Sequence, residues 1–150
     1  MPATYEHTQV GHVTIAAVTA GVVVAVVAAV VARHAVPAIV AVLLLILLSQ
    51  LATLTTSVAD GVLEVRMGTG LFRRRIALKD VERVAVIRHL WVWGWGIRWT
   101  PFGWQWNVSG TRGVELTYRS GRRFRIGSDE PEALASAIAS WLERGAHVDV

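Results

Sequence analysis

The residue types that most often perform catalysis are sparse in this chain, and their spacing matches no catalytic arrangement. The histidines show no metal-ligand spacing; they are His7, His12, His34, His89 and His147. The absence of cysteine excludes disulfides and thiolate metal sites. No nucleophile elbow, phosphate-binding loop or dinucleotide fingerprint occurs. The sequence therefore predicts a protein that is not an enzyme and uses no metal or cofactor.

Arginine is the main candidate for binding chemistry, because it supplies 14 of the 15 basic residues and the formal net charge is +4. Two clusters, RRR at 73–75 and RRFR at 122–125, fall on predicted strands. Period-two alternation selects one outward pair from each cluster as candidate lipid contacts: Arg73, Arg75, Arg123 and Arg125. Each basic residue close to an anionic leaflet contributes about 1 kcal/mol. The alternative is a solvated strand face, with Glu64 and Glu115 among the partners.

Tryptophan is the second candidate, since six of the seven lie in WVWGWGIRWTPFGWQW, residues 91–106. On strands, the tryptophans at 91, 93 and 95 would share one face, and so would those at 104 and 106. The rings could fill the core of a small β domain or line a groove for a peptide or small ligand. They could also sit at the membrane interface, where Trp91 and Trp93 are the best candidates.

Two apolar runs precede these clusters. Residues 13–32 carry no charge, and residues 36–54 are polar only at Ser49, Gln50 and Thr53. Each run is long enough to cross about 30 Å of hydrocarbon as a helix. We predict a transmembrane hairpin over 13–54, preceded by a tail over 1–12. That tail has no Lys or Arg, which argues against a signal peptide.

Small residues recur every four positions in the first run and form a candidate helix–helix contact: Ala17, Gly21, Ala25 and Ala29. This stripe would pack against the second helix, or it would support a homo-oligomer. Arginine follows the second run closely, at positions 66 and 73–75, whereas the tip of the hairpin offers Arg33. The positive-inside rule then places the N-terminus and the C-terminal domain in the cytoplasm, on the plasma (inner) membrane.

Residues 55–145 read as a β domain closed by a helix. Apolar and polar residues alternate between glycine-rich turns, which predicts seven antiparallel strands: 62–67, 71–78, 82–89, 91–99, 104–108, 113–118 and 122–127. A three-residue loop at 119–121 with Gly121 left-handed would place Leu116 opposite Phe124 and Val114 opposite Ile126. An apolar stripe over 130–144 predicts an amphipathic helix that packs on the sheet, followed by a tail over 146–150.

The order of these features resembles the bacterial pleckstrin-homology-like membrane proteins. The resemblance lies in LFRRRIALKDVERVAV, GWGIRWTPFGWQWNVSG and GRRFRIGSDEPEAL, and covers roughly residues 55–140. It implies a seven-stranded, bent antiparallel sheet or barrel, capped by the C-terminal helix and held beneath the membrane. It does not imply phosphoinositide binding, because the turn of the first hairpin is the uncharged GTG at 68–70.

These observations together predict a membrane-anchored scaffolding module. The domain would dock on the anionic inner leaflet, with the lipid bilayer and possible protein partners as ligands. The alternative is a structural or assembly subunit of a larger membrane complex that associates through its transmembrane helices. No nucleic-acid partner is expected, since no reading motif accompanies the basic charge.

Overall fold

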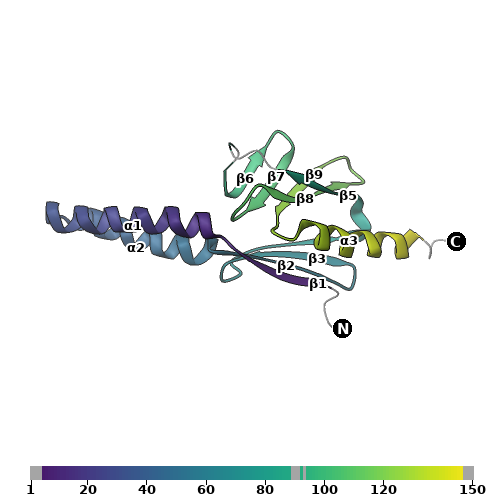
Figure 1. The fold of residues 1–150 in the computed structure, drawn as a ribbon, viewed down its shortest axis with the longest axis horizontal. Helices are drawn as coiled ribbons and strands as arrows, with labels where there is room; N and C mark the ends of the chain where they lie inside the picture. Colours follow the sequence, from purple (N-terminus) through teal and green to yellow (C-terminus); the bar gives the residue numbers. More distant parts are fainter. Residues whose placement is uncertain (1–4, 89–91, 93, 147–150) are drawn as a thin grey trace.

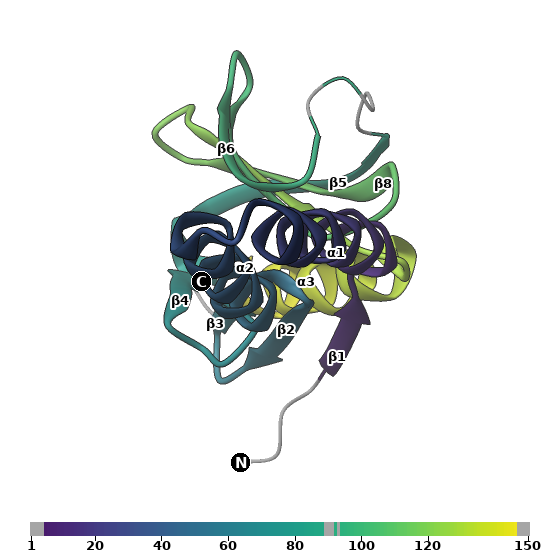
Figure 2. The same ribbon diagram turned by 90° about the vertical axis from the view of Figure 1, so that its left-hand side faces the viewer.

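The computed structural model describes residues 5–88, 92 and 94–146 of the chain. Within these residues the fold is α+β, with three α-helices and two open sheets of four and five strands. Two long helices, α1 (His12–Ala32) and α2 (Ala35–Leu51), project from one end of the β part (Figure 1). The third helix, α3 (Pro131–Ala146), lies between the two sheets (Figure 2).

The helical hairpin is inserted between the first two strands of the four-stranded sheet. This sheet, sheet A, has the order β1-β2-β3-β4 and is antiparallel throughout. Its strands are β1 (Tyr5–Val10), β2 (Thr53–Ala59), β3 (Val62–Met67) and β4 (Phe72–Ala77). The chain therefore leaves the sheet after β1, runs out and back through α1 and α2, and returns beside its starting point as β2.

The prediction of seven strands was wrong, because β1 and β2 were not anticipated. Residues 1–12 were predicted as a tail, yet Tyr5–Val10 pair with Thr53–Val58. The run predicted as a second span over 36–54 also ends early, since Leu54 is buried in the sheet core. Polar residues dominate both strands, so neither shows a strong apolar period. Each segment forms a strand because it pairs with the other, and no local sequence pattern reveals that pairing.

The two projecting helices differ in how well they fit a bilayer. With 21 residues, α1 is long and apolar enough to cross a membrane. With 17 residues, α2 is a shorter apolar helix, about 26 Å long at 1.5 Å per residue. Most of their large side chains are exposed, including Val24, Val31 and Leu43. Within the described residues, one helix thus meets the requirements for a span.

Small residues allow α1 and α2 to lie against each other. Ala25 of α1 and Ala41 of α2 are buried, and a Cβ added at Gly21 would stand 3.4 Å from Cδ1 of Leu44. Ala29 is half-buried, whereas Ala17 is exposed. The middle of the predicted small-residue stripe therefore faces α2, and its N-terminal member does not.

Enlarging this contact is expected to weaken the hairpin. Gly21→Leu, made together with Ala25→Leu, inserts branched side chains into a packed seam, and such overpacking costs about 1–3 kcal/mol. We expect the midpoint of SDS-induced unfolding of the full chain to fall. The matched control Val24→Leu changes an exposed site and is expected to leave the midpoint unchanged. If the variants unfold like the parent protein but lose chemically cross-linked dimers, the stripe joins copies of the chain instead.

The base of the hairpin is tied directly to sheet A. The backbone N–H of Gly11, between β1 and α1, donates to the carbonyl of Ala52, between α2 and β2, at 2.7 Å. Gly68, in the β3–β4 turn, has φ +50° and lies against the carbonyls of Ser49 and Gln50 at the end of α2. A side chain there would be strained by the left-handed backbone and would meet those carbonyls. The helices and the sheet thus join with almost no linker.

Sheet B has five strands in the order β5-β8-β9-β7-β6. They are β5 (Val81–Arg88), β6 (Gly96–Thr100), β7 (Gly103–Asn107), β8 (Arg112–Tyr118) and β9 (Arg123–Gly127). A short 3-10 helix, η1 (Leu78–Asp80), carries the chain from β4 to β5. The pair β7 and β9 is parallel, so the expectation of an all-antiparallel, barrel-like sheet was wrong.

The register predicted for the β8–β9 hairpin is confirmed. Leu116 pairs with Phe124 and Val114 with Ile126. Gly121 has φ +81°, and its N–H donates to the carbonyl of Tyr118 at 2.8 Å, which closes the three-residue loop. A slip of one residue would turn every apolar side chain outward, so the alternation and the three-residue turn together fix this register.

The core lies between the facing sides of the two sheets. Sheet A contributes Leu63, Val65 and Met67, which are fully buried, and sheet B contributes Leu116 and Ile126. From α3, Leu134 and Ile138 are also fully buried, and this helix contacts β5, β8 and η1. The helix therefore fills the gap between the sheets on one side of the domain.

Side chains of the first strand contact the segment that precedes α3 and the loop between β7 and β8. Nε2 of His7 lies 2.8 Å from the Asp129 carboxylate, and the Gln9 amide donates to the carbonyl of Ser109 at 3.0 Å. Burial raises the pKa of Tyr5 to about 12, and the carboxylates of Glu130 and Asp129 add to this effect. These polar contacts integrate β1 into the domain.

Candidate functional site

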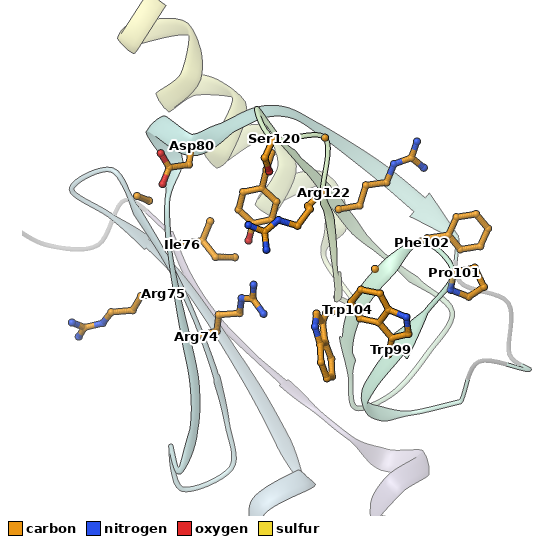
Figure 3. Close-up of a pocket in the computed structure, with 15 residues that line it drawn as sticks. Arg74, Arg75, Ile76, Asp80, Trp99, Pro101, Phe102, Trp104, Ser120 and Arg122 are labelled. Carbon is orange, nitrogen blue, oxygen red and sulfur yellow. The ribbon is translucent and has the colours of Figure 1, made fainter.

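A large cavity lies on the side of the domain that α3 does not fill, between the edge strands β4 and β6. Its volume is about 710 Å³. Four segments line it: β4, the β6–β7 hairpin, the β8–β9 turn and Asp80 of η1. Figure 3 shows this space open between the two sheets, with side chains reaching in from both. We call it the lateral cleft.

Arg74 is the most distinctive residue of the lateral cleft. It shares the inner face of β4 with Phe72 and the buried Ile76, and it is half-buried. Its guanidinium lies over the ring of Phe124, with Cζ 4.5 Å from the ring centre. In Figure 3 the side chain extends toward Trp104. A cation in contact with the hydrophobic core is thus presented to the cavity.

Arg122 is the second cation of the lateral cleft. It leaves the β8–β9 turn and reaches back into the cavity toward β4 (Figure 3). Across residues 5–88, 92 and 94–146, neither Arg122 nor Arg74 has a carboxylate within 4.0 Å. Asp80 is the single acidic residue among the described lining side chains, against four arginines. The cleft therefore carries a net positive charge.

The arginines predicted as lipid contacts each lie near a glutamate of their own sheet. On sheet A, Arg75 donates to Glu64 at 2.6 Å and Arg73 lies 3.9 Å from it. The Arg75 hydrogen bond holds the pKa of the Glu64 carboxyl below its ordinary value. In Figure 3 Arg75 points away from the cavity. The outer face of β4 is thus neutralised in part by its own sheet.

On sheet B, Arg125 donates to Glu115 at 2.7 Å, and both side chains are 12% exposed. Arg123 lies 3.7 Å from the same carboxylate, and the Arg125 guanidinium also stacks on Phe102 at 4.2 Å. The two predicted pairs sit on different sheets, and each is organised around one glutamate. One member of each pair, Arg75 and Arg123, also lines the lateral cleft.

Three of the described tryptophans divide between the core and the lateral cleft. Trp106 is buried and meets Phe124 edge-on, with ring centres 6.1 Å apart. Trp99 and Trp104 are 69% and 42% exposed and form a T-shaped pair at 5.5 Å. The predicted strand over 91–99 is shorter than expected, because β6 begins at Gly96. Trp91 and Trp93, the candidate membrane contacts, lie outside the described residues.

Sequence reasoning passed over Arg74 and Arg122, although both lie within the clusters that it identified. The signal for Arg74 was available, since alternation places it between Phe72 and Ile76 on an otherwise apolar face. An arginine on such an apolar face needs an environment that accommodates its charge. Arg122 had no such signal, because its direction depends on the turn at 119–121.

The chemistry of the cleft is that of binding. Arginine guanidinium groups recognise phosphate or carboxylate groups through paired hydrogen bonds, and exposed indole rings provide apolar contact surface. In the described part of the chain, no three His, Asp or Glu side chains gather where they could hold a metal ion. No protein-family model matches the chain, and no curated protein or solved structure is significantly similar to it.

Proposed function

We propose that this chain is a non-enzymatic, membrane-anchored binding module. Its helical hairpin spans the bilayer, and its β domain docks on the anionic inner leaflet of a bacterial plasma membrane. The observation that carries the proposal is the direct junction between the exposed apolar helices and sheet A, sealed by the Gly11–Ala52 hydrogen bond. A domain attached without a linker must rest against the headgroup layer.

Strand pairing supports two spans. Because β1 precedes α1 and β2 follows α2, their antiparallel pairing holds both ends of the hairpin on the same side. If α1 crosses the bilayer, α2 must cross back. A helix of 17 residues lies at the lower limit for a span, and Ser49 and Gln50 near its end would sit at headgroup level.

The surface beside the helices suits a headgroup layer. Leu71 and Phe72 follow the β3–β4 turn, which lies against the end of α2, and they are 74% and 40% exposed. Arg66 and Arg73 lie on the same hairpin. Exposed apolar side chains flanked by cations favour contact with an anionic interface.

Most of the central stripe of α1 is engaged with α2, which leaves less support for assembly through that stripe.

Single cysteines can test the topology cleanly, because the chain has none of its own. Ala35→Cys marks the hairpin tip, and Lys79→Cys marks η1 at the far end of the domain. In intact bacterial cells, we expect a membrane-impermeant maleimide to label position 35 directly and position 79 after permeabilisation. Labelling of both positions under one condition would contradict two spans.

A third variant, Leu71→Cys, tests docking. With a fluorophore at position 71 and the full chain in lipid nanodiscs, we expect quenching by headgroup-labelled lipid when phosphatidylglycerol is present. Raising the salt concentration should reduce the quenching, since it screens charge. The same label at position 79 should remain unquenched. If position 71 is quenched no more than position 79, the domain does not dock.

A further inference from the structure

The lateral cleft contains more positive charge than the fold itself uses. Arg75 and Arg123 line its rim but are bound to Glu64 and Glu115. Arg74 and Arg122 lie inside it with no carboxylate within 4.0 Å in the part of the chain that is described. Arg74 has also lost part of its hydration, because it is half-buried over Phe124. Partly desolvated cations favour an anionic ligand.

The walls of the cleft also contain apolar and aromatic side chains. Trp99 and Trp104 form one wall with much of their surface exposed, and Ile76 lies on the opposite wall. A free inorganic anion would leave these indole rings uncovered. The combination of unpaired guanidinium groups and exposed rings fits a ligand that has an anionic end and an apolar end.

The position of the cleft favours a ligand from the bilayer. Along the inner face of β4, the exposed Phe72 lies next to the helix base and Arg74 follows two residues farther away. At about 3.3 Å per residue, this places Arg74 about 7 Å beyond Phe72. Each headgroup layer is about 5–8 Å deep. A headgroup at the leaflet surface can therefore reach Arg74 by passing over Phe72.

We infer that the lateral cleft binds the phosphate headgroup of one anionic phospholipid from the adjoining leaflet. The guanidinium groups of Arg74 and Arg122 contact the phosphate, and Trp99 and Trp104 cover the glycerol and the upper part of an acyl chain. This inference rests on the proposed function, since it needs the domain to lie at the membrane. It goes further by assigning one lipid molecule to one site between the two sheets.

Native mass spectrometry of the full chain, released from nanodiscs of mixed phosphatidylglycerol and phosphatidylcholine, tests the inference. We expect one retained phosphatidylglycerol per chain. The double substitution Arg74→Gln and Arg122→Gln should lower the retention of phosphatidylglycerol at least tenfold. The matched control Arg83→Gln removes one exposed cation on β5, outside the lateral cleft, and should retain the lipid. Equal retention of the two lipids by the parent protein would overturn the inference.

A second measurement does not depend on the folding of the double arginine variant. Phosphatidylglycerol brominated in its upper acyl chain should quench tryptophan emission of the full chain in nanodiscs. The quenched portion should fall when Trp99→Phe and Trp104→Phe are combined. Brominated phosphatidylcholine should give no such difference. An unchanged quenched portion in the double variant would overturn the placement of the lipid beside these rings.

Three outcomes would overturn this inference, and the second of them leaves the proposed function standing. If millimolar inorganic phosphate displaces the retained lipid, the site binds free phosphate and the lipid assignment is wrong. If the label at position 71 is quenched at the headgroup layer but no phosphatidylglycerol is retained, docking stands and the single-lipid site falls. If an extended peptide protects the β4 edge from hydrogen exchange and no lipid is retained, the cleft belongs to a protein partner.

Discussion

Replacing Phe124 with alanine is expected to lower the free energy of unfolding by about 3–5 kcal/mol. The ring is 1% exposed, pairs with Leu116 across the sheet and meets Trp106 edge-on. Its removal leaves a cavity at the centre of sheet B and withdraws the surface on which Arg74 rests. Chemical denaturation of the full chain in detergent, followed by tryptophan emission, measures the change.

Phe102→Ala provides the matched control, because it deletes the same ring at a site that is 41% exposed. There the ring stacks on the Arg125 guanidinium, which is 12% exposed, and a cation–π contact contributes about 0.5–2 kcal/mol. Phe124→Leu should recover most of the stability that alanine loses. Equal effects of the two alanine substitutions would mean that Phe124 is not the centre of the core.

Removal of residues 1–10 is expected to be at least as damaging. It deletes the whole of β1, its ladder to β2 and the contact between His7 and Asp129. At about 0.5–1.5 kcal/mol for each net hydrogen bond, a six-residue edge strand with about six ladder bonds contributes about 3–9 kcal/mol. Domain stabilities are about 5–15 kcal/mol, so we expect loss of a cooperative unfolding transition in detergent.

The substitution Glu6→Ala controls for this deletion, since it removes an exposed side chain and keeps the strand backbone. It should leave the transition in place. The same reasoning applies to a fragment without the two long helices. A chain beginning at residue 55 lacks β1 and the first two residues of β2. Such a fragment, if it unfolded cooperatively with the midpoint of the full chain, would contradict the role assigned to β1.

Local pattern predicted those parts of the fold in which neighbouring residues decide the outcome. The β8–β9 hairpin was predicted to the register, because its alternating faces and its glycine turn agree. The C-terminal helix was predicted within two residues at each end. The aromatic stretch misled the same reasoning, since Gly94 and Gly96 have φ +66° and +99° and interrupt the expected strand. Alternating letters do not make a strand where the backbone turns.

The lateral cleft could not be predicted from the sequence. It depends on the two sheets diverging on the side away from α3, and this divergence depends on contacts between distant segments. The arginine clusters were found, but alternation directed attention to Arg73 and Arg75, which their own sheet neutralises. The residue between them, Arg74, is directed inward by the same alternation. The same alternation therefore places Arg73 and Arg75 on the outer face and Arg74 on the inner face.

The insertion of α1 and α2 between β1 and β2 has a consequence for biosynthesis. The first strand leaves the ribosome early but finds its partner only after both helices have been made and have brought the chain back. If only one helix of the hairpin were inserted, β1 and β2 would lie on opposite sides of the bilayer. Sheet A would then lack its first strand. If the hairpin spans the bilayer as we propose, sheet A can therefore be completed only after both helices have crossed.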